Sequence, residues 1–484
     1  MNYLDKQVGF NKMNNNTTFK ILTLIIFIAL LIPTLVQEGM FLDGITYAAI
    51  SKNMANGYGQ FWEPHYTKVL YSSFSEHPPL VFIIESLFFK LLGNHFYTER
   101  IFTFLTALLT ALGIIMCWRQ LAKNIGIKAN YWLPVLLWLI VPVVSWSYRN
   151  NMLENTMSVF TTFSVFFIIK SLKENNIYLV PLSGIFIICA FLSKGFVGLF
   201  PIATPLIFGI IFKQNKKSIL YFLALILNVF VISFIAIKFF PDIINNISKY
   251  LNQQFFPALK GEREITTDNR LKIIFDLLID LSGIFALYIL LLMTRIKSNL
   301  NKNADYNKNF LLFLIIGISA SFPLMISLKQ SKYYLIPSMP FYALSFGYLL
   351  YNSLMEKLTK ISEIKIKWFN KLLYLALGLL VIFSISNFGK YSRDMEKIKD
   401  VNLVSSSLKE GTVISCSKEM CTDWSLVAYF SRIGYISLDC NHEHSYFLIK
   451  NGDEMPPNYG HIELKGNEYT LLKKSTETKN QFSQ

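Results

Sequence analysis

TMSVFTTFSVFFIIK (residues 156–170), SLKENN (171–176) and IYLVPLSGIFIICAFLS (177–193) follow one another in the middle of the chain. The two apolar runs have about the length of a membrane-spanning helix. Lys170 and Lys173 lie at the junction between them, and membrane proteins concentrate such basic residues in short cytoplasmic loops. This stretch therefore predicts a helical hairpin that crosses a membrane twice, with its connecting loop in the cytoplasm.

Similar runs occur on both sides of this hairpin. They lie near residues 19–36, 101–118, 131–147, 196–212, 218–237, 272–294, 309–327, 333–351 and 371–387. The composition agrees with this pattern, since 53% of the 484 residues are hydrophobic and only 16% are charged, against roughly 25% charged in soluble proteins. We therefore expect a polytopic α-helical membrane protein with about 11 transmembrane helices, within a range of about 10 to 13. This class excludes a cytosolic enzyme, a nucleic-acid-binding protein and a disulfide-stapled secreted domain.

The net charge of +15 is distributed as the topology requires. The run Leu80–Leu92 is short and contains Glu85 and Lys90, so we place it at the membrane interface rather than across it. With the N-terminus in the cytoplasm, the basic loops then all become cytoplasmic. These loops contain Arg119, Lys123 and Lys128; Lys170 and Lys173; Lys213, Lys216 and Lys217; Arg295, Lys297 and Lys302; and Lys357 to Lys371.

The same topology predicts two domains. Residues 1–388 form the transmembrane domain, whose first outer loop covers about 37–100, and residues 389–484 form a small extracytoplasmic α/β domain. The C-terminal domain contains strand-like runs at Gly411–Ser415 and Gly434–Leu438. Its three cysteines, Cys416, Cys421 and Cys440, allow at most one internal disulfide, and three free thiols are the alternative.

The first outer loop contains two acidic candidates. Asp43 follows the first apolar run and begins a short helical pattern, so it either accepts a proton from a hydroxyl at the membrane surface or complements a helix dipole. Glu76 and His77 precede Pro78 and Pro79, which either fix these side chains in a site or only begin the next helix. On residue types alone, a solvated His77 is the simpler interpretation.

Cationic residues lie at the outer ends of several other runs. Arg149, Lys194 and Lys332 each occupy such a position, with Lys329 as a fourth candidate and Tyr333 beside Lys332. Taken singly, each cation is explained by a charged group that reaches the membrane surface along an apolar helix. Taken together, they provide the charge that binding of a lipid-linked phosphate requires.

The order of these motifs resembles bacterial members of the dolichyl-phosphate-mannose:protein mannosyltransferase superfamily, which include lipid A aminoarabinose transferases. The resemblance covers roughly residues 19–350. Its motifs are Asp43, Tyr47 and Met54; Glu76-His77-Pro78-Pro79-Leu80; Leu92-Gly93; Arg100; Arg149 to Glu154; Ser193-Lys194-Gly195 with Pro201; and Lys332, Leu335 and Pro340. Gly44 and Thr46 depart from the family pattern, so the resemblance does not extend to aminoarabinose specificity.

This resemblance implies a type C glycosyltransferase fold and a glycosyltransferase (hexosyl- or pentosyltransferase) in the bacterial inner membrane. A sugar on a polyprenyl phosphate would pass, outside the cytoplasm, to a hydroxyl of an envelope acceptor: a protein, a lipid or a polysaccharide. Asp43 matches the catalytic acid, with Glu76 as the second candidate. The residues implied to bind substrate are Tyr47, His77, Arg149, Lys194, Lys332 and Tyr333. No nucleotide is needed in this scheme. A divalent ion at Glu76 and His77 stays open as a cofactor, although two ligands do not define a site.

Two other functions are compatible with a polytopic chain. A lipid or glycan transporter or flippase would carry its charges near the membrane midplane, whereas here they gather at one face. A glycan ligase would use a polyprenyl-diphosphate donor, which a donor assay distinguishes from a monophosphate.

Overall fold

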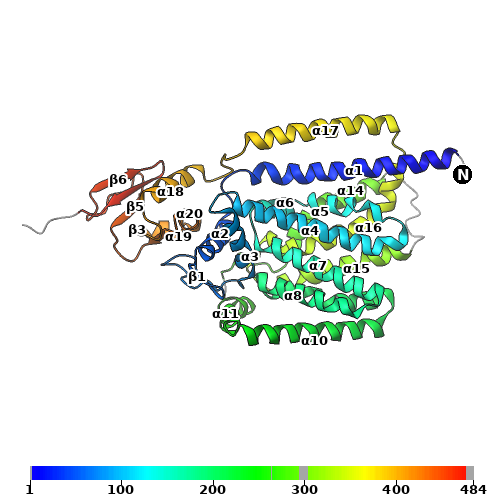
Figure 1. Cartoon of the computed structure of the whole chain (residues 1–484), viewed down its shortest axis with the longest axis horizontal. Coiled ribbons are helices and arrows are strands. Elements are labelled where there is room, and N and C mark those ends of the chain that lie inside the picture. Colours follow the sequence, from blue (N-terminus) through cyan, green and yellow to red (C-terminus); the bar gives the residue numbers. More distant parts are fainter. Residues whose placement is uncertain (1–2, 263, 294–303, 476–484) are drawn as a thin grey trace, which may run out of the picture. The chain divides into compact units, whose positions relative to one another are not determined.

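The computed structural model describes residues 3–262, 264–293 and 304–475, and most of these residues are helical (Figure 1). The chain forms two compact units. The helical unit comprises Met1–Val36, Glu76–Val81 and Arg100–Phe388, and the sheet unit comprises Gln37–Ser75, Phe82–Glu99 and Gly389–Gln484. This division differs from the predicted one, because most of the first outer loop belongs to the same unit as the C-terminal segment.

The helical unit contains fifteen of the described α-helices, joined by several 3-10 turns and one π-helix. The α-helices are α1 (Tyr3–Leu35), α4 (Thr98–Ala122), α5 (Trp132–Leu139), α6 (Pro142–Arg149), α7 (Leu153–Glu174), α8 (Val180–Lys194), α9 (Thr204–Phe212), α10 (Asn215–Phe239), α11 (Asp242–Tyr250), α12 (Phe256–Lys260), α13 (Lys272–Asp280), α14 (Ser282–Met293), α15 (Ala304–Ser321), α16 (Met339–Leu358) and α17 (Glu363–Ser386). The 3-10 turns used below are η4 (Phe196–Ala203), η6 (Phe322–Ile326) and η7 (Lys332–Ser338), and the π-helix is η5 (Leu251–Phe255).

Within the described part of the chain, seven helices are long and apolar enough to cross a membrane, or nine if two bent pairs are each one span. The predicted number of about eleven is not confirmed, because several expected runs are broken. Residues 131–147 divide into two segments bent by 80° at Pro142, and residues 272–294 bend by 52° between α13 and α14. A proline lacks the backbone N–H that would continue the helix, which accounts for the first break.

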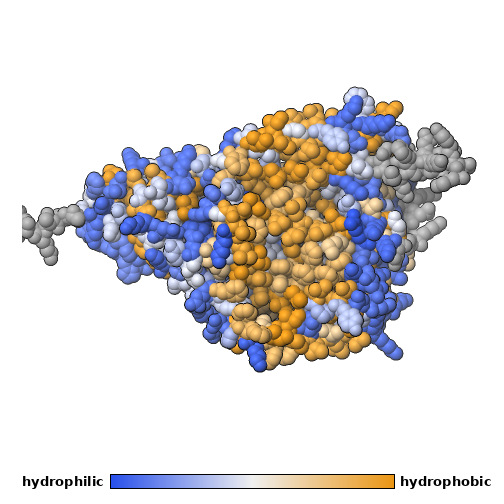
Figure 2. All heavy atoms as spheres, in the orientation of Figure 1, coloured by the Kyte–Doolittle hydropathy of each residue, from blue (hydrophilic) through white to orange (hydrophobic). Residues whose placement is uncertain are grey.

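The helices of this unit carry an apolar surface suited to lipid. α10 and α17 are exposed along most of their length, and their exposed residues are mainly leucine, isoleucine and phenylalanine. Figure 2 shows the resulting hydrophobic belt over the helices, with hydrophilic residues along its right-hand edge. Such a belt confirms the membrane-protein class, because a soluble protein rarely exposes so large an apolar area.

Two of the predicted basic loops, those at Lys170–Lys173 and Lys213–Lys217, lie together at one end of the helical unit. Lys173 at the end of α7 lies 4.4 Å from the ring centroid of Phe212 at the end of α9. Lys217 at the start of α10 donates hydrogen bonds to Leu172 and Asn175. The predicted basic loop at Arg295, Lys297 and Lys302 lies outside the described residues. The ends of α7 and α8 that face away from this cluster carry Glu154 and Lys194.

The sheet unit combines a five-stranded sheet with helices from the outer loop and the C-terminal segment. Its strands are β3 (Val413–Cys416), β4 (Ser437–Asp439), β5 (Tyr446–Lys450), β6 (His461–Lys465) and β7 (Tyr469–Lys473), and their order is β4-β3-β5-β7-β6. β3 is parallel to β4 and β5, while β7 is antiparallel to β5 and β6. The C-terminal helices are α18 (Met395–Ser407), α19 (Lys418–Thr422) and α20 (Trp424–Gly434). The predicted small α/β fold of this segment is confirmed.

The outer loop contributes α2 (Leu42–Ala55), the short strands β1 (Gly59–Gln60) and β2 (Glu63–Pro64), and most of α3 (Leu80–Leu92). α3 has 13 residues and is not among the helices long enough to span. Its Glu85 is fully buried and accepts a hydrogen bond of 2.7 Å from the Ser51 hydroxyl of α2. This bond gives the buried Glu85 carboxylate a polar partner. In a membrane crossing the same carboxylate would be costly to bury.

The basic end of the helical unit predicts the orientation of the chain. A reporter fused after Lys216 should give a cytoplasmic signal, and one fused after Asn402 an extracytoplasmic signal, because lysine-rich loops remain on the cytoplasmic side. Compartment-specific reporters such as alkaline phosphatase measure both positions. A cytoplasmic signal after Asn402 would contradict the topology.

Candidate active site

One cavity of about 330 Å³ lies within the helical unit, at the helix ends opposite the lysine-rich loops. Its ionisable lining residues include Glu76, His77, Glu154, Lys194 and Lys329. Its remaining lining residues are Met157, Phe196, Val197, Tyr250, Gln254, Phe255, Ala258, Leu259, Pro323, Leu324, Ile326, Ser327 and Tyr334. A few charged groups over an apolar wall suit a ligand that combines a polar head with a hydrocarbon chain.

Lys194 and Glu154 form an ion pair at the centre of this arrangement. Lys194 is the last residue of α8 and Glu154 lies in the first turn of α7, and their side chains are 9% and 0% exposed. The lysine Nζ also lies 5.4 Å from the ring centroid of Tyr333 and 4.6 Å from that of Tyr334. The carboxylate and the two aromatic rings together hold the ammonium group in place.

Gly195 allows the neighbouring wall of the cavity to close. It ends α8 with φ +88°, and a Cβ there would lie 1.9 Å from the hydroxyl oxygen of Tyr250. Tyr250 is the last residue of α11, directly before the π-helix η5, which carries Gln254. Single-turn π segments are frequent at functional sites. The Gln254 Oε1 atom is buried without a hydrogen-bond partner among the described residues, so it is available to a ligand hydroxyl.

The turn between α6 and α7 positions both Arg149 and Glu154. The Arg100 side chain of α4 donates a 2.7 Å hydrogen bond to the Arg149 carbonyl, and Thr103 donates one of 2.9 Å to the Tyr148 carbonyl. The Arg149 side chain itself donates to the Ser145 carbonyl at 3.0 Å. The Arg149–Glu154 motif is therefore a fixed turn rather than a loose loop, although Arg149 is not among the cavity-lining residues.

Lys332 and Tyr333 begin η7. The Lys332 Nζ lies 3.8 Å from a carboxylate oxygen of Asp276, which Lys272 also contacts at 2.7 Å. Tyr333 stacks on Trp146 of α6 with ring centroids 5.6 Å apart. Since Tyr333 also contacts Lys194, η7 connects the Lys332–Asp276 pair to the cavity.

Asp43 and Tyr47 lie on α2 in the sheet unit. Asp43 is in the first turn and is half-buried, while Tyr47 is buried with its ring centroid 5.9 Å from that of Phe82. α2 packs against α20, and its Asn53 donates a 2.8 Å hydrogen bond to the Tyr66 carbonyl. The helix that carries the predicted base is thus anchored to α20 and to the Tyr66 backbone.

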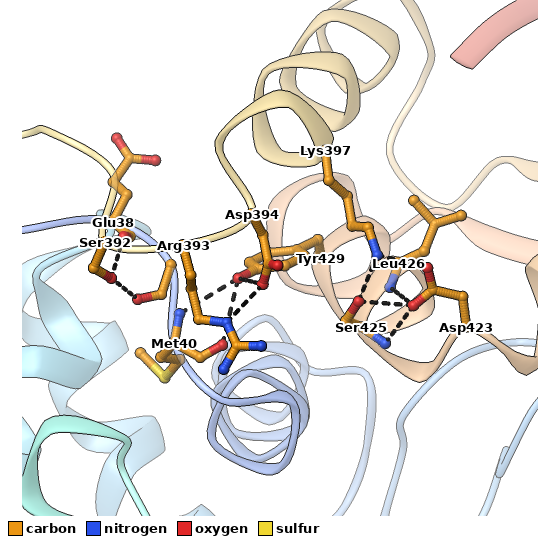
Figure 3. A network of polar contacts seen from close by, with 11 residues as sticks. Glu38, Met40, Ser392, Arg393, Asp394, Lys397, Asp423, Ser425, Leu426 and Tyr429 are labelled. Atoms are coloured by element: carbon orange, nitrogen blue, oxygen red, sulfur yellow. Dashed lines mark hydrogen bonds and ion pairs between the residues drawn. The ribbon is translucent and has the colours of Figure 1, made fainter. Parts of the chain in front are cut away.

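The C-terminal segment also fixes the residues directly before α2 (Figure 3). The Tyr429 hydroxyl of α20 lies 3.4 Å from the backbone nitrogen of Met40 and donates to Asp394 at 3.0 Å. Ser392 donates from its backbone and from its hydroxyl to the Glu38 carbonyl, at 2.8 and 2.9 Å. A buried ion pair between Arg432 and Glu99, 2.8 Å long, ties the other end of the outer loop to α20.

No group of three or more histidine, cysteine, aspartate or glutamate side chains that could hold a metal ion occurs within residues 3–262, 264–293 and 304–475. Glu76 and His77 are therefore not part of such a group. The arrangement supports hydrogen bonding and charge stabilisation by protein side chains.

The structure brings Glu76, His77 and Lys194 to one cavity, together with Lys329. The sequence-based candidates did not include Glu154, Tyr250, Gln254 or Tyr334, which line the same cavity. The sequence does contain an indication for Glu154, because an acid at the start of an apolar helix requires a partner. It contains no such indication for Tyr250 and Gln254, since a π-helix has no distinctive sequence period.

Comparison with known proteins gives matches of two kinds. Residues 76–237 match the family model described as dolichyl-phosphate-mannose-protein mannosyltransferase. No curated protein sequence matches the chain. The structure resembles ArnT from Cupriavidus metallidurans in the apo state, with a TM-score of 0.63 and 12% identity, covering 94% of this chain and 96% of that one. It also resembles ArnT bound to undecaprenyl phosphate, with a TM-score of 0.61 and 13% identity over 94% of this chain and 97% of that one.

A third similar structure is the oligosaccharyltransferase of Archaeoglobus fulgidus in the apo form, with a TM-score of 0.50 and 10% identity, covering 86% of this chain and 64% of that one. The fold is therefore the type C glycosyltransferase fold. The family-model match over residues 76–237 agrees with the resemblance that the sequence motifs indicated.

The Lys194–Glu154 pair should contribute strongly to stability only as a pair. Lys194→Met should lower the free energy of unfolding by about 3–5 kcal/mol, because it leaves a buried carboxylate without its partner. The double variant with Glu154→Leu should recover most of this loss. Thermal or denaturant unfolding of the purified protein in detergent measures both.

Lys329→Met is the matched control. Its ion pair with Glu264 is 3.3 Å long, and that glutamate is 75% exposed, so the expected change is below about 1 kcal/mol. Equal stability of Lys194→Met and the wild-type protein would show that the buried pair does not support the fold.

Proposed function

We propose that the chain is an extracytoplasmic glycosyltransferase of the bacterial inner membrane, which moves a sugar from a polyprenyl-phosphate donor to a hydroxyl of an envelope acceptor. The observation that carries the proposal is the cavity with Lys194, Lys329 and His77 above an apolar wall. A polyprenyl-phosphate donor has the same two parts, an anionic head and a long hydrocarbon chain. The ArnT structure bound to undecaprenyl phosphate shows that this fold accepts such a lipid.

Charge balance in the cavity indicates how the phosphate would be held. Two lysines face two carboxylates, Glu76 and Glu154, so the cavity has no excess of lysine charge. Lys194 stays with Glu154, whereas Lys329 can leave its exposed partner Glu264 at little cost. Phosphate oxygens would therefore accept hydrogen bonds from Lys329 and His77. A protonated His77 would supply the positive charge that balances the bound phosphate.

Further polar groups would complete the donor site. Arg149 and Lys332, together with Tyr333, are the sequence-based candidates for contacts with the phosphate or the sugar. The link through Tyr333 to Lys194 supports a role for this segment. The unpartnered Gln254 oxygen would accept a hydrogen bond from a sugar hydroxyl.

The role assigned to Asp43 rests on the sequence resemblance. As the acceptor oxygen attacks the anomeric carbon, the Asp43 carboxylate would take the hydroxyl proton. The bond between the anomeric carbon and the phosphate oxygen breaks, and its electron pair stays with the departing polyprenyl phosphate. Cationic donors stabilise the charge on that phosphate. Tyr47 would orient the substrate, and Glu76 is the alternative base.

The position of the charged residues favours an enzyme over a transporter. Glu154 and Lys194 occupy helix ends rather than the middle of a span, whereas transporters place coupling and substrate-binding residues near the membrane midplane. A ligase that uses polyprenyl diphosphate remains the second enzyme class, and the donor assay separates the two.

Purified protein should consume sugar linked to a polyprenyl monophosphate and release the polyprenyl phosphate. A matched polyprenyl-diphosphate sugar should give at least about tenfold lower kcat/KM, because the site is proposed to bind a single phosphate. Extracted envelope from a deletion strain serves as the acceptor, and radiolabelled sugar measures transfer. Exclusive use of the diphosphate donor would identify the chain as a ligase, and use of neither donor would contradict the proposed function.

Asp43→Asn should lower the transfer rate by roughly a hundredfold to ten-thousandfold, since the amide keeps the shape of the side chain but removes its basicity. Donor binding should be retained. Transfer is measured per folded molecule and per bound donor.

Asp242→Asn is the control, because Asp242 is an exposed acid in the first turn of α11. It should leave the rate unchanged. Near-wild-type turnover of Asp43→Asn would remove Asp43 from the mechanism and leave Glu76 as the candidate base.

A further inference from the structure

Three cysteines meet at one edge of the sheet unit. Cys416 is the last residue of β3, and Cys440 directly follows β4, whose Asp439 is the register partner of Ser415. Cys421 lies on α19, and its sulfur is 3.3 Å from that of Cys416. The Cys421 thiol also interacts with the thiol of Cys440. The fold thus gathers residues that are up to 24 positions apart in the sequence.

The cluster lies at a distinctive place in the sheet. From β3 the chain continues through α19 and α20 to β4 on one side of β3, while the later strand β5 pairs on its other side. The carboxyl end of β3 is therefore a point where the strand order reverses, and side chains that follow parallel strands converge there. Cys416 is buried, whereas Cys421 and Cys440 are only partly buried, so a reagent can reach two of the thiols.

Neighbouring polar groups belong to the same edge. The Asp439 carboxylate accepts hydrogen bonds of 3.0 Å from His442 and 2.9 Å from His444. Burial of Asp439 raises its pKa, but the bonds from His444, the Asn441 backbone and His442 outweigh burial and lower the pKa to about 2. Both histidines are therefore engaged by a carboxylate, and the described residues contain no group arranged to hold a metal ion. The contact between the Cys416 and Cys421 sulfurs supports thiol chemistry at this edge.

We propose that Cys416 and Cys421 form a disulfide in the sheet unit and that Cys440 remains a thiol. This inference rests on the extracytoplasmic orientation in the proposed function, because that compartment in a diderm cell favours disulfides. The two thiols lose two protons and two electrons, and a disulfide-donor protein accepts them and is reduced to two thiols. The donor would react first with the more accessible Cys421, and Cys416 would then displace it.

Two observations explain the assigned pair and the need for a donor. Cys416 and Cys421 are in sulfur–sulfur contact and belong to consecutive elements, β3 and α19, so the bond would join the strand to the segment that leads into α20. Burial raises the pKa of both thiols, that of Cys421 to about 11, so few thiolates are present at neutral pH. Unassisted oxidation should consequently be slow.

Trypsin separates all three cysteines, since Lys409, Lys418, Arg432 and Lys450 place each one in a different peptide. Full-length protein purified from cells is alkylated under denaturing, non-reducing conditions and analysed by mass spectrometry. The expected product links peptide 410–418 to peptide 419–432, with Cys440 alkylated. Cys117 and Cys189, which lie in membrane helices, should also be alkylated and serve as internal controls.

Cysteine variants test the assigned pairing of Cys416 with Cys421. Cys440→Ser should keep the link, whereas Cys421→Ser should abolish it without creating a link between Cys416 and Cys440. Reduced wild-type protein incubated with oxidised glutathione should regain the same link, which tests the pairing independently of the orientation of the chain. Reduction should lower the melting temperature of the wild-type protein but not that of Cys421→Ser.

A disulfide that includes Cys440 would overturn the proposal. Alkylation of all three cysteines in protein from cells would also overturn it, and so would thiols that react only after a chelator is added. These outcomes leave the proposed function untouched, because the transfer assay uses none of these residues. Failed transfer with the expected link would instead contradict the function alone.

Discussion

The buried ion pair between Lys194 and Glu154 is the interaction on which the helical unit and its cavity both depend. Each charge would be costly alone among apolar helices, so the two must remain together and the ends of α7 and α8 must meet. Gly195 then reverses the chain and admits Tyr250, while Tyr333 and Tyr334 cover the lysine. A single electrostatic requirement therefore brings four distant segments to one cavity.

The sheet unit depends on a different constraint, because it is assembled from separate parts of the chain. The residues directly before α2 are held by Tyr429 and Ser392 of the C-terminal segment, and Arg432 of α20 pairs with Glu99 at the other end of the outer loop. The C-terminal segment is thus a structural support for the helix that carries Asp43. A change in α20 can consequently alter the position of Asp43 without any contact with substrate.

The distribution of apolar and charged residues along the sequence predicted the membrane class. Apolar runs and lysine-rich loops gave the membrane class, and the order of motifs from Asp43 to Pro340 gave the glycosyltransferase fold. The number of spans could not be predicted well, because Pro142 and the bend between α13 and α14 divide runs that look continuous. Residues such as Gln254 were inaccessible to sequence reasoning, since their importance arises from packing between segments that are distant in the chain.

We propose that the cavity around Lys194 binds the phosphate end of a polyprenyl phosphate. Photo-crosslinking tests it most directly, with a polyprenyl phosphate that carries a photoreactive group next to the phosphate. Crosslinks are expected within Phe196–Val197, Tyr250–Leu259 and Pro323–Tyr334, and unlabelled polyprenyl phosphate should compete with the probe. Crosslinks confined to the lysine-rich ends of α7, α9 and α10, or labelling that does not compete, would contradict it.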